Sequence, residues 1–345
     1  MRRNRPFQFE PQFEDGFCIN GCLPKDEDSE ELEAELLASA VPINLWLNYD
    51  ADEMPFIKCD SAFEEWLDSE IRTADQLRNE KIQNLLPWAV LKALTAERRK
   101  SERLYFTQGR MPSCMGHADV FALHSSTLTG ISRGLPLIYE SFNPIVTWSI
   151  SKGGSTRGGQ NVTAMAKFSN NTGHFPESLV GTNNQIIPNY SPHVNEAKNY
   201  RTGIVFLSGK GAALARLITR CCRAGLGVAC GNSTAVRSSM RDANGIKVAV
   251  VGGSWAHATS FTGYRNIGGE EYVFWVNSHG PRYGRSDEGE PADGAWMRTE
   301  KELTQFCATM DRYGAPYAVL PRSRTVNDLS HVTSIRVPFP TGFRH

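Results

Sequence analysis

A cysteine directly before a predicted helix is the residue of this 345-residue sequence that is best suited to chemistry. Cys114 ends the run Gln108-Gly-Arg-Met-Pro-Ser-Cys, and the stretch from Met115 to Leu128 has no proline and, after Gly116, no glycine. The positive end of a helix dipole lowers the pKa of a thiol placed there and favours the thiolate, which is the nucleophilic form. A cysteine alone is more simply explained as an inert buried thiol, so the interpretation of Cys114 depends on its partners.

A nucleophilic thiolate needs an imidazole as its base, and the imidazole needs a group that orients it. His257 opens a predicted strand over residues 257–264, and Asn277 ends a predicted strand over residues 271–277. A hairpin loop joins the two strands, so the start of the first lies beside the end of the second. We therefore expect His257 to contact Asn277, and a His257 ring nitrogen to lie within about 4 Å of the Cys114 sulfur.

These residues, in this order, resemble the papain-like cysteine peptidases of the papain family. That family has a glutamine six residues before the cysteine, a helix that begins at the cysteine, a His-Ala strand that ends in Gly-Tyr, and then Asn-Ser-x-Gly. The resemblance covers roughly residues 101–320. The matching residues are Gln108, Cys114, His257, Ala258, Gly263, Tyr264, Asn277, Ser278 and Gly280, with Gly158 and Gly159 as a weaker match.

The resemblance implies a papain-like α+β fold with two lobes. The helical lobe would carry the cysteine, and an antiparallel, β-barrel-like lobe would carry the histidine and the asparagine. Cys114 would be the nucleophile, His257 the general base and then the general acid, and Asn277 the group that orients the imidazole. Gln108 would donate its side-chain amide to the oxyanion, together with the backbone N–H of Cys114.

The activity that the resemblance implies is that of a cysteine-type endopeptidase. It would hydrolyse a peptide or isopeptide bond of a polypeptide substrate through a thioester, without a metal or other cofactor. Gly158 and Gly159 resemble the glycine pair that borders the substrate in that family. A transferase or amidase that uses the same residues on another acyl group is not distinguished from a peptidase by the sequence.

Two positions depart from the family pattern. Met115 follows the nucleophile where the family usually has tryptophan, and His279 replaces the tryptophan that covers the histidine–asparagine hydrogen bond. Loss of that apolar cover predicts that the bond is exposed to water and orients the imidazole less well. The alternative is therefore a weakly active or inactive papain-like module, a structural or interaction component of a large assembly such as a virus particle.

The sequence around these residues predicts three parts. Residues 1–100 form an acidic N-terminal extension with helices near 29–40, 60–72 and 87–100, residues 101–320 the peptidase domain, and residues 321–345 a tail. After residue 200 we expect one helix at 212–224 and strands at 204–207, 227–230, 246–252, 257–264 and 271–277. The segment 170–200 is expected to be a long irregular connection. Helices followed by a mostly antiparallel sheet indicate the α+β class.

Charge is distributed unevenly along the chain. Residues 1–100 hold 12 Lys/Arg and 21 Asp/Glu, whereas residues 101–345 hold 25 and 16. The acidic extension is expected to dock on the basic remainder or on a structural protein partner. A helical stripe in the extension should pack on the body; its residues are Phe63, Trp66, Leu67 and Ile71.

Composition excludes several classes of function. The formal net charge of zero argues against a nucleic-acid binder, and apolar runs fall far short of the ~20 residues of a membrane span. The basic N-terminus is not followed by an apolar segment, so we expect no secretion and a cytoplasmic or virion location. The 8 cysteines are expected to be thiols rather than disulfides.

Overall fold

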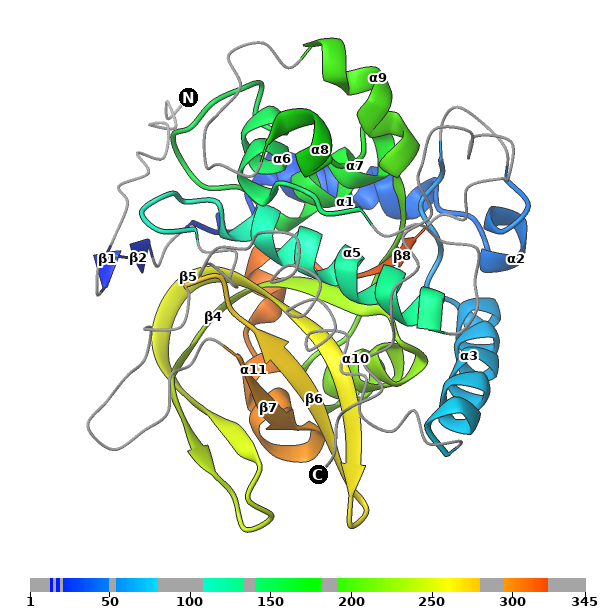
Figure 1. The fold of residues 1–345 in the computed structure, drawn as a ribbon, viewed down its shortest axis with the longest axis vertical. Helices are drawn as coiled ribbons and strands as arrows, with labels where there is room; N and C mark the ends of the chain where they lie inside the picture. The colour runs from blue at the N-terminus through cyan, green and yellow to red at the C-terminus, as the bar shows by residue number, and fades with distance from the viewer. Residues whose placement is uncertain are drawn as a thin grey trace.

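The computed structural model describes residues 13–14, 17–18, 21–49, 54–79, 108–132, 140–181, 191–279 and 294–321. Within these ranges the predicted α+β class is confirmed: helices pack against a six-stranded sheet (Figure 1). The helices are α1 (Glu27–Ala38), α2 (Ile43–Trp46), α3 (Ser61–Asn79), α5 (Cys114–Ser132), α6 (Pro144–Ile150), α7 (Val162–Asn171), α8 (Glu177–Val180), α9 (Val194–Ala197), α10 (Gly211–Ala224) and α11 (Thr304–Cys307). Other helical turns, of the 3-10 or π type, are η1 (Ser191–His193), η2 (Lys198–Tyr200), η3 (Thr299–Leu303) and η4 (Met310–Tyr313).

The large sheet has the order β3-β8-β4-β5-β6-β7, and its strands pair antiparallel along that order. A parallel pairing of Val248 with Trp296 also joins β5 to β7, so the last three strands curl onto one another. A separate small pair is formed by β1 (Phe13–Glu14) and β2 (Phe17–Cys18). The strands of the large sheet are β3 (Thr202–Phe206), β4 (Gly227–Arg241), β5 (Lys247–Ile267), β6 (Glu270–Val276), β7 (Gly294–Arg298) and β8 (Tyr317–Pro321).

The predicted strands at 246–252 and 257–264 are wrong as separate elements, because both lie in the single strand β5. The register between β4 and β5 shifts where Thr234 pairs with Ser254 and Val236 with Val251. Gly253 lies inside that shift with φ +80°, a conformation that glycine adopts readily. The segment between the two predicted strands therefore forms a bulge, which bends the strand without ending it.

Helix α5 runs across the sheet, with α6 to α9 on its other side (Figure 1). It approaches β4 closely, because a Cβ on Gly227 would lie 2.2 Å from the carbonyl oxygen of Ala122. Buried Asp119 fixes α5 to other elements: it accepts hydrogen bonds from Ser169 (2.6 Å), His174 (2.7 Å) and Tyr317 (2.7 Å). These contacts hold the end of α5 that carries Cys114 in a fixed place over the sheet.

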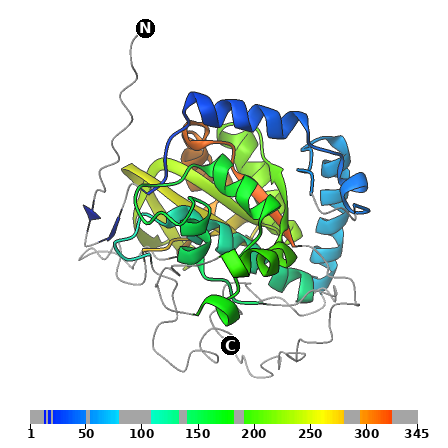
Figure 2. The same cartoon turned by 90° about the horizontal axis from the view of Figure 1, so that it is seen from above.

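The N-terminal extension is built into the same body. Ile57 forms a parallel bridge to Val205 of β3 and another to Val41, so two short segments of the extension continue the sheet. Figure 2 shows α1, α2 and α3 wrapped around the outside of the molecule. Residues 21–40 thus lie along the chain's own body, whereas the division at residue 100 stays a prediction.

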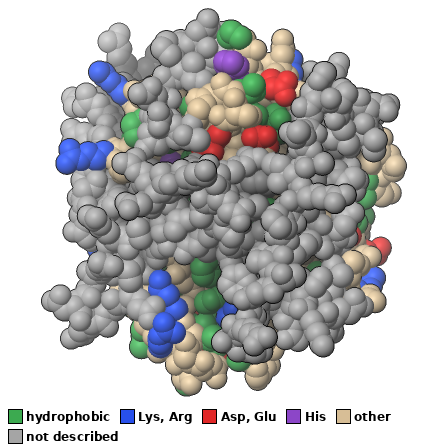
Figure 3. All heavy atoms as spheres, in the orientation of Figure 1, with side chains coloured by type: hydrophobic (Ala, Val, Ile, Leu, Met, Phe, Trp, Pro, Cys, Tyr) green, Lys and Arg blue, Asp and Glu red, His purple; other side chains and the backbone are tan. Residues whose placement is uncertain are grey.

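Helix α3 packs on α10 as the apolar stripe predicted, with Phe63 and Leu67 fully buried in the shared core. Asp60 caps the helix by accepting from the N–H of Phe63 at 3.1 Å. Arg220 on α10 pairs with Glu64 at 2.9 Å and Asp68 at 2.8 Å. Some acidic side chains of the N-terminal extension are therefore paired with a basic side chain of the same molecule. In Figure 3, the coloured acidic and basic side chains are scattered over the face rather than gathered in one patch.

Two further predictions concern the segments 87–100 and 170–200. The predicted helix at 87–100 lies outside the described residues. The irregular connection expected at 170–200 instead contains the short elements α8, η1, α9 and η2 within the part that the structure describes. Each of these has three or four residues, which is too short for a hydrophobic period to appear in the sequence.

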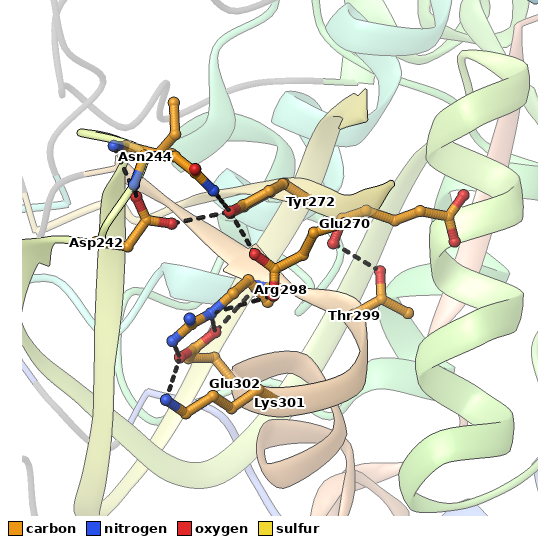
Figure 4. Close-up of polar contacts among 10 residues, drawn as sticks. Asp242, Asn244, Glu270, Tyr272, Arg298, Thr299, Lys301 and Glu302 are labelled. Carbon is orange, nitrogen blue, oxygen red and sulfur yellow. Dashed lines mark hydrogen bonds and ion pairs between the residues drawn. The ribbon is translucent and has the colours of Figure 1, made fainter. Parts of the chain in front are cut away.

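A polar network ties the far end of the β4–β5 hairpin to the neighbouring strands (Figure 4). The Tyr272 hydroxyl lies 2.8 Å from Asp242 and 2.6 Å from Glu270, and it accepts from Asn244 at 3.1 Å. Burial and the two carboxylates raise the pKa of Tyr272 to about 12. Arg298 pairs with Glu302 beside this group, so a hairpin that extends beyond the core keeps a defined position.

Candidate active site

Helix α5 begins at Cys114, as the sequence predicted, and Cys114 is 0% exposed. His117, one turn further along, is also buried and its Nδ1 donates to the carbonyl oxygen of Ser113 at 3.0 Å. Because a carbonyl is an acceptor, the hydrogen of this neutral imidazole lies on Nδ1. Burial lowers the pKa of His117 to about 4, so the ring stays neutral at physiological pH.

His257 and Asn277 are neighbours, as the hairpin predicted. His257 Nε2 lies 2.8 Å from Asn277 Oδ1, which is an acceptor, so Nε2 carries the hydrogen. The Asn277 amide is itself held in this orientation, because its Nδ2 contacts His279 Nδ1 at 3.3 Å. The basic lone pair of His257 is thereby assigned to Nδ1, the nitrogen that a general base would use.

Nδ1 of His257 is buried and has no hydrogen-bond partner in the described part of the chain. Nδ1 therefore forms no hydrogen bond with Cys114 in this structure, and the expected distance of about 4 Å between the Cys114 sulfur and a His257 ring nitrogen stays a prediction. Their closeness is supported indirectly: Cys114 shares a buried cluster with Ala258, the residue after His257. His117 also lies near enough to add to the lowering of the His257 pKa, which burial brings to about 3.

The expected exposure of the His257–Asn277 hydrogen bond is wrong. His279 stacks on the His257 ring at a centroid distance of 4.0 Å, and His257 is 0% exposed. Trp255 contacts the same ring at 4.7 Å and lies edge-on to His279 at 5.9 Å. Trp255 on β5 and the imidazole of His279 together supply the cover that the absence of the family tryptophan at position 279 led us not to expect.

Gln108 lies beside the asparagine segment. Its backbone N–H donates to the Ser278 carbonyl at 2.9 Å, and its Oε1 accepts from the Ser278 hydroxyl at 2.6 Å. Its Nε2 donates to the Met111 carbonyl at 3.2 Å. The structure therefore joins the loop before Cys114 to the residue after Asn277, and it directs the amide NH₂ toward the cysteine loop. The catalytic roles of Gln108, Cys114 and their partners stay predictions.

Residues 21–23 of the same chain cross directly over Cys114. The N–H of Cys22 donates to the Ala256 carbonyl at 3.0 Å, the Gly21 carbonyl accepts from Gln160 at 3.1 Å, and Leu23 donates to Gln160 at 3.0 Å. A Cβ on Gly21 would lie 2.9 Å from the Cys114 sulfur and 2.9 Å from the Pro112 carbonyl. Only a residue without a side chain can pass so close, so Gly21 covers the thiol with bare backbone.

Gly159, predicted to border the substrate, lines this covering segment. A Cβ there would lie 2.4 Å from the Gly21 carbonyl oxygen. Gly158 has φ +75° and its carbonyl accepts from Lys152 at 2.6 Å. Gly159 thus lets an extended chain lie flat beside it, whereas a Cβ on Gly158 would meet only Lys152 Nζ, at 3.9 Å. The position of residues 21–23 was not predicted. The sequence signal is weak: Gly21 allows close approach of the backbone, and Leu23, before Pro24, favours extended backbone.

Acid should destabilise the fold through His117 and His257. Both pKa values are depressed below about 6.5, the ordinary value in an unfolded chain, so the unfolded state binds more protons as pH falls. Their contribution to the free energy of unfolding is complete above pH ~6.5. As pH falls below that value, each histidine loses about 1.4 kcal/mol of it per pH unit. We expect the free energy of urea unfolding to fall steeply between pH ~6.5 and ~5, above the range in which carboxylates protonate. A His117→Gln variant should lose about half of that slope, and an unchanged slope would contradict the assignment.

Two further properties concern the described residues only. No group of three or more His, Cys, Asp or Glu side chains is placed there to hold a metal ion. No described helix is both long and apolar enough to cross a membrane.

Comparison with known proteins gives structural similarity but no sequence match. No family model matches the chain, and no curated protein matches it. Among solved structures it is similar to procathepsin L 3 of the Tenebrio molitor larval midgut, with 15% identity over 62% of this chain and 64% of that chain and a TM-score of 0.41. Xylellain, a cysteine protease of Xylella fastidiosa, has 14% identity over 63% of this chain and 82% of its own, with a TM-score of 0.41. The proform of the ragweed pollen cysteine protease Amb a 11 has 14% identity over 64% and 63%, with a TM-score of 0.41. The chain thus covers less than two thirds of the length of the procathepsin and of Amb a 11.

Proposed function

We propose that this chain is a papain-like, cysteine-type endopeptidase that hydrolyses peptide or isopeptide bonds through a thioester on Cys114. The observation that carries the proposal is the state of His257. Its Nε2–H is fixed by Asn277, and its Nδ1 lone pair is buried without a partner in the described part of the chain. A buried polar atom without a hydrogen bond is costly for a fold, and a catalytic role is one explanation for such an atom.

The chemistry follows from these positions. Nδ1 of His257 takes the proton of the Cys114 thiol while the sulfur attacks the substrate carbonyl carbon. The oxyanion accepts hydrogen bonds from the Gln108 amide and from the Cys114 N–H. His257 then gives its proton to the leaving amine, the C–N bond breaks and a thioester remains. Water attacks the thioester, His257 accepts its proton, and the carboxylic acid product leaves as the thiol is restored.

The proposed active site is covered in this structure. Residues 21–23 lie over the thiol, and both Cys114 and His257 are 0% exposed. The Gly21 carbonyl accepts from the Gln160 N–H, which is not one of the predicted oxyanion donors. Burial also keeps His257 neutral and so opposes a thiolate–imidazolium pair. We propose that catalysis requires residues 21–23 to leave.

The same burial favours the second candidate, an inactive papain-like module of a large assembly. In that case residues 21–23 would be a permanent part of the core. Complete burial of Cys114 and His257 is what an inert module would also have, so accessibility of the thiol separates the two candidates.

The test is covalent labelling of the full chain at pH 7 with a peptidyl acyloxymethyl ketone, run for hours because the thiol must wait for local opening. We expect mass spectrometry to locate the adduct on Cys114. Cys59 is an internal control: it is less buried, but burial and Glu64 raise its pKa to about 11, so it should react slowly. Labelling of Cys59 with none of Cys114 would favour the inactive module.

A further inference from the structure

The contacts of residues 21–23, which cover Cys114, indicate which peptide residues the proposed active site accepts. Residues 21–23 are held by backbone groups: the N–H and carbonyl of Gln160 on one side and the carbonyl of Ala256 on the other. Backbone hydrogen bonds of this kind do not depend on side chains, so any extended peptide could form them once residues 21–23 have left. Selectivity must therefore come from the side-chain contacts.

The side chain of Cys22 supplies those contacts. It is 1% exposed and lies over the bare Cα of Gly231, which pairs with Ala258 in the β4–β5 register. A Cβ on Gly231 would lie 2.6 Å from the Cys22 sulfur, 2.7 Å from Tyr313 Cβ and 3.0 Å from Val162 Cγ2. We call Val162, Gly231 and Tyr313 the Gly231 site.

The size and polarity of the Gly231 site restrict its occupant. The sulfur of Cys22 is the single heavy atom beyond Cβ, and it already lies 2.6 Å from where a Gly231 methyl group would be. Because Cys22 is 1% exposed and shares a buried cluster with Tyr313 and Val162, we expect a side chain as long as leucine or phenylalanine to displace one of them. The surroundings are apolar, since Cys22 belongs to a buried cluster with Val162 and Tyr313, so a charged side chain would lose its hydration without a partner.

We infer that the peptidase selects polypeptides with alanine, serine or cysteine at the residue that enters the Gly231 site, next to the residue that lies on Cys114. The inference rests on the proposed function and names its substrate class. Gly231 is then a specificity-determining residue, because its missing Cβ creates the space, and Tyr313 limits how far that space extends.

A contact test measures the Gly231 site without catalysis. In the otherwise native chain, Gly231→Ala should expel the Cys22 side chain and raise the alkylation rate of Cys22 by at least tenfold, read by mass spectrometry. Gly252→Ala is the matched control, because a Cβ there meets no atom within 4 Å. An unchanged Cys22 rate in Gly231→Ala would show that Gly231 does not set the size of this site.

A substrate test uses the Gly21→Val chain, in which the covering segment is displaced. Fluorogenic peptides that differ only in glycine, alanine, cysteine, leucine or phenylalanine at one position should be cleaved at least tenfold faster with alanine or cysteine than with leucine or phenylalanine. Adding Gly231→Ala should reduce cleavage of the alanine peptide at least tenfold more than cleavage of the glycine peptide; cleavage of the glycine peptide also reports that the variant is folded.

The outcomes separate this inference from the proposed function. Cleavage that is fastest with leucine or phenylalanine overturns the substrate class and leaves the peptidase intact. Cleavage of no peptide by any variant overturns both. The cleavage rates of the different peptides by the Gly21→Val chain, which keeps Gly231, decide the inference even if Gly231→Ala does not fold.

Discussion

Replacing Gly21 by valine is expected to raise the alkylation rate of Cys114 at neutral pH by about 100-fold or more. In the native chain the thiol reacts only when residues 21–23 open, and a local opening free energy of about 3 kcal/mol slows a reaction by that factor. A valine Cβ would lie 2.9 Å from the Cys114 sulfur and from the Pro112 carbonyl, where backbone cannot give way easily. The segment must therefore leave its three backbone hydrogen bonds, which exposes the thiol.

The control is Gly252→Val. Gly252 also lies in extended backbone, but a Cβ there has no atom within 4 Å, so the substitution has no reason to move residues 21–23. The rates are compared by mass spectrometry of the Cys114 peptide after timed exposure to iodoacetamide. Equal rates in the native chain and Gly21→Val, with Gly252→Val unchanged, would mean that residues 21–23 do not limit access to Cys114.

Local sequence patterns predicted the elements that position the candidate site. The helix that begins at Cys114 was predicted because a long stretch without proline follows it, and α5 begins at that residue. The contact of His257 with Asn277 was predicted because a hairpin fixes which residues of two adjacent strands are opposite. The packing of α3 was predicted from the spacing of Phe63 and Leu67, since helical period alone identifies a buried face.

Features that depend on contacts distant in sequence were not predicted. The cover over His257 comes from Trp255 and His279, and only His279 lies within the Asn-Ser-x-Gly pattern. The strand β8 lies between β3 and β4, more than seventy residues from the nearer one, and no local pattern indicates that place. Residues 21–23 reach Cys114 across more than ninety residues, through backbone contacts that leave almost no trace in residue type.

Cys114→Ala should abolish peptide hydrolysis by the Gly21→Val chain, to below a ten-thousandth of the parent rate, because alanine has no nucleophile. Cys22→Ala is the matched control: it removes a second thiol buried in the same cluster, and one that the mechanism does not use, so hydrolysis should persist. Loss of activity in Cys22→Ala with activity kept in Cys114→Ala would assign the nucleophile to the other cysteine.

Gln108→Ala should give an intermediate loss of roughly 10²–10³ in kcat, the usual cost of one oxyanion donor. Its contacts with Ser278 and Met111 also position the loop before Cys114, so Gln108→Glu is the informative second variant. Glutamate keeps the length of the side chain but replaces the donating NH₂ by an acceptor oxygen. A donor role predicts that Gln108→Glu is at least as slow as Gln108→Ala while KM stays near the parent value. If instead KM rises and kcat is kept, Gln108 orders the loop and the oxyanion is stabilised by other donors, because an interaction made only in the transition state acts on kcat.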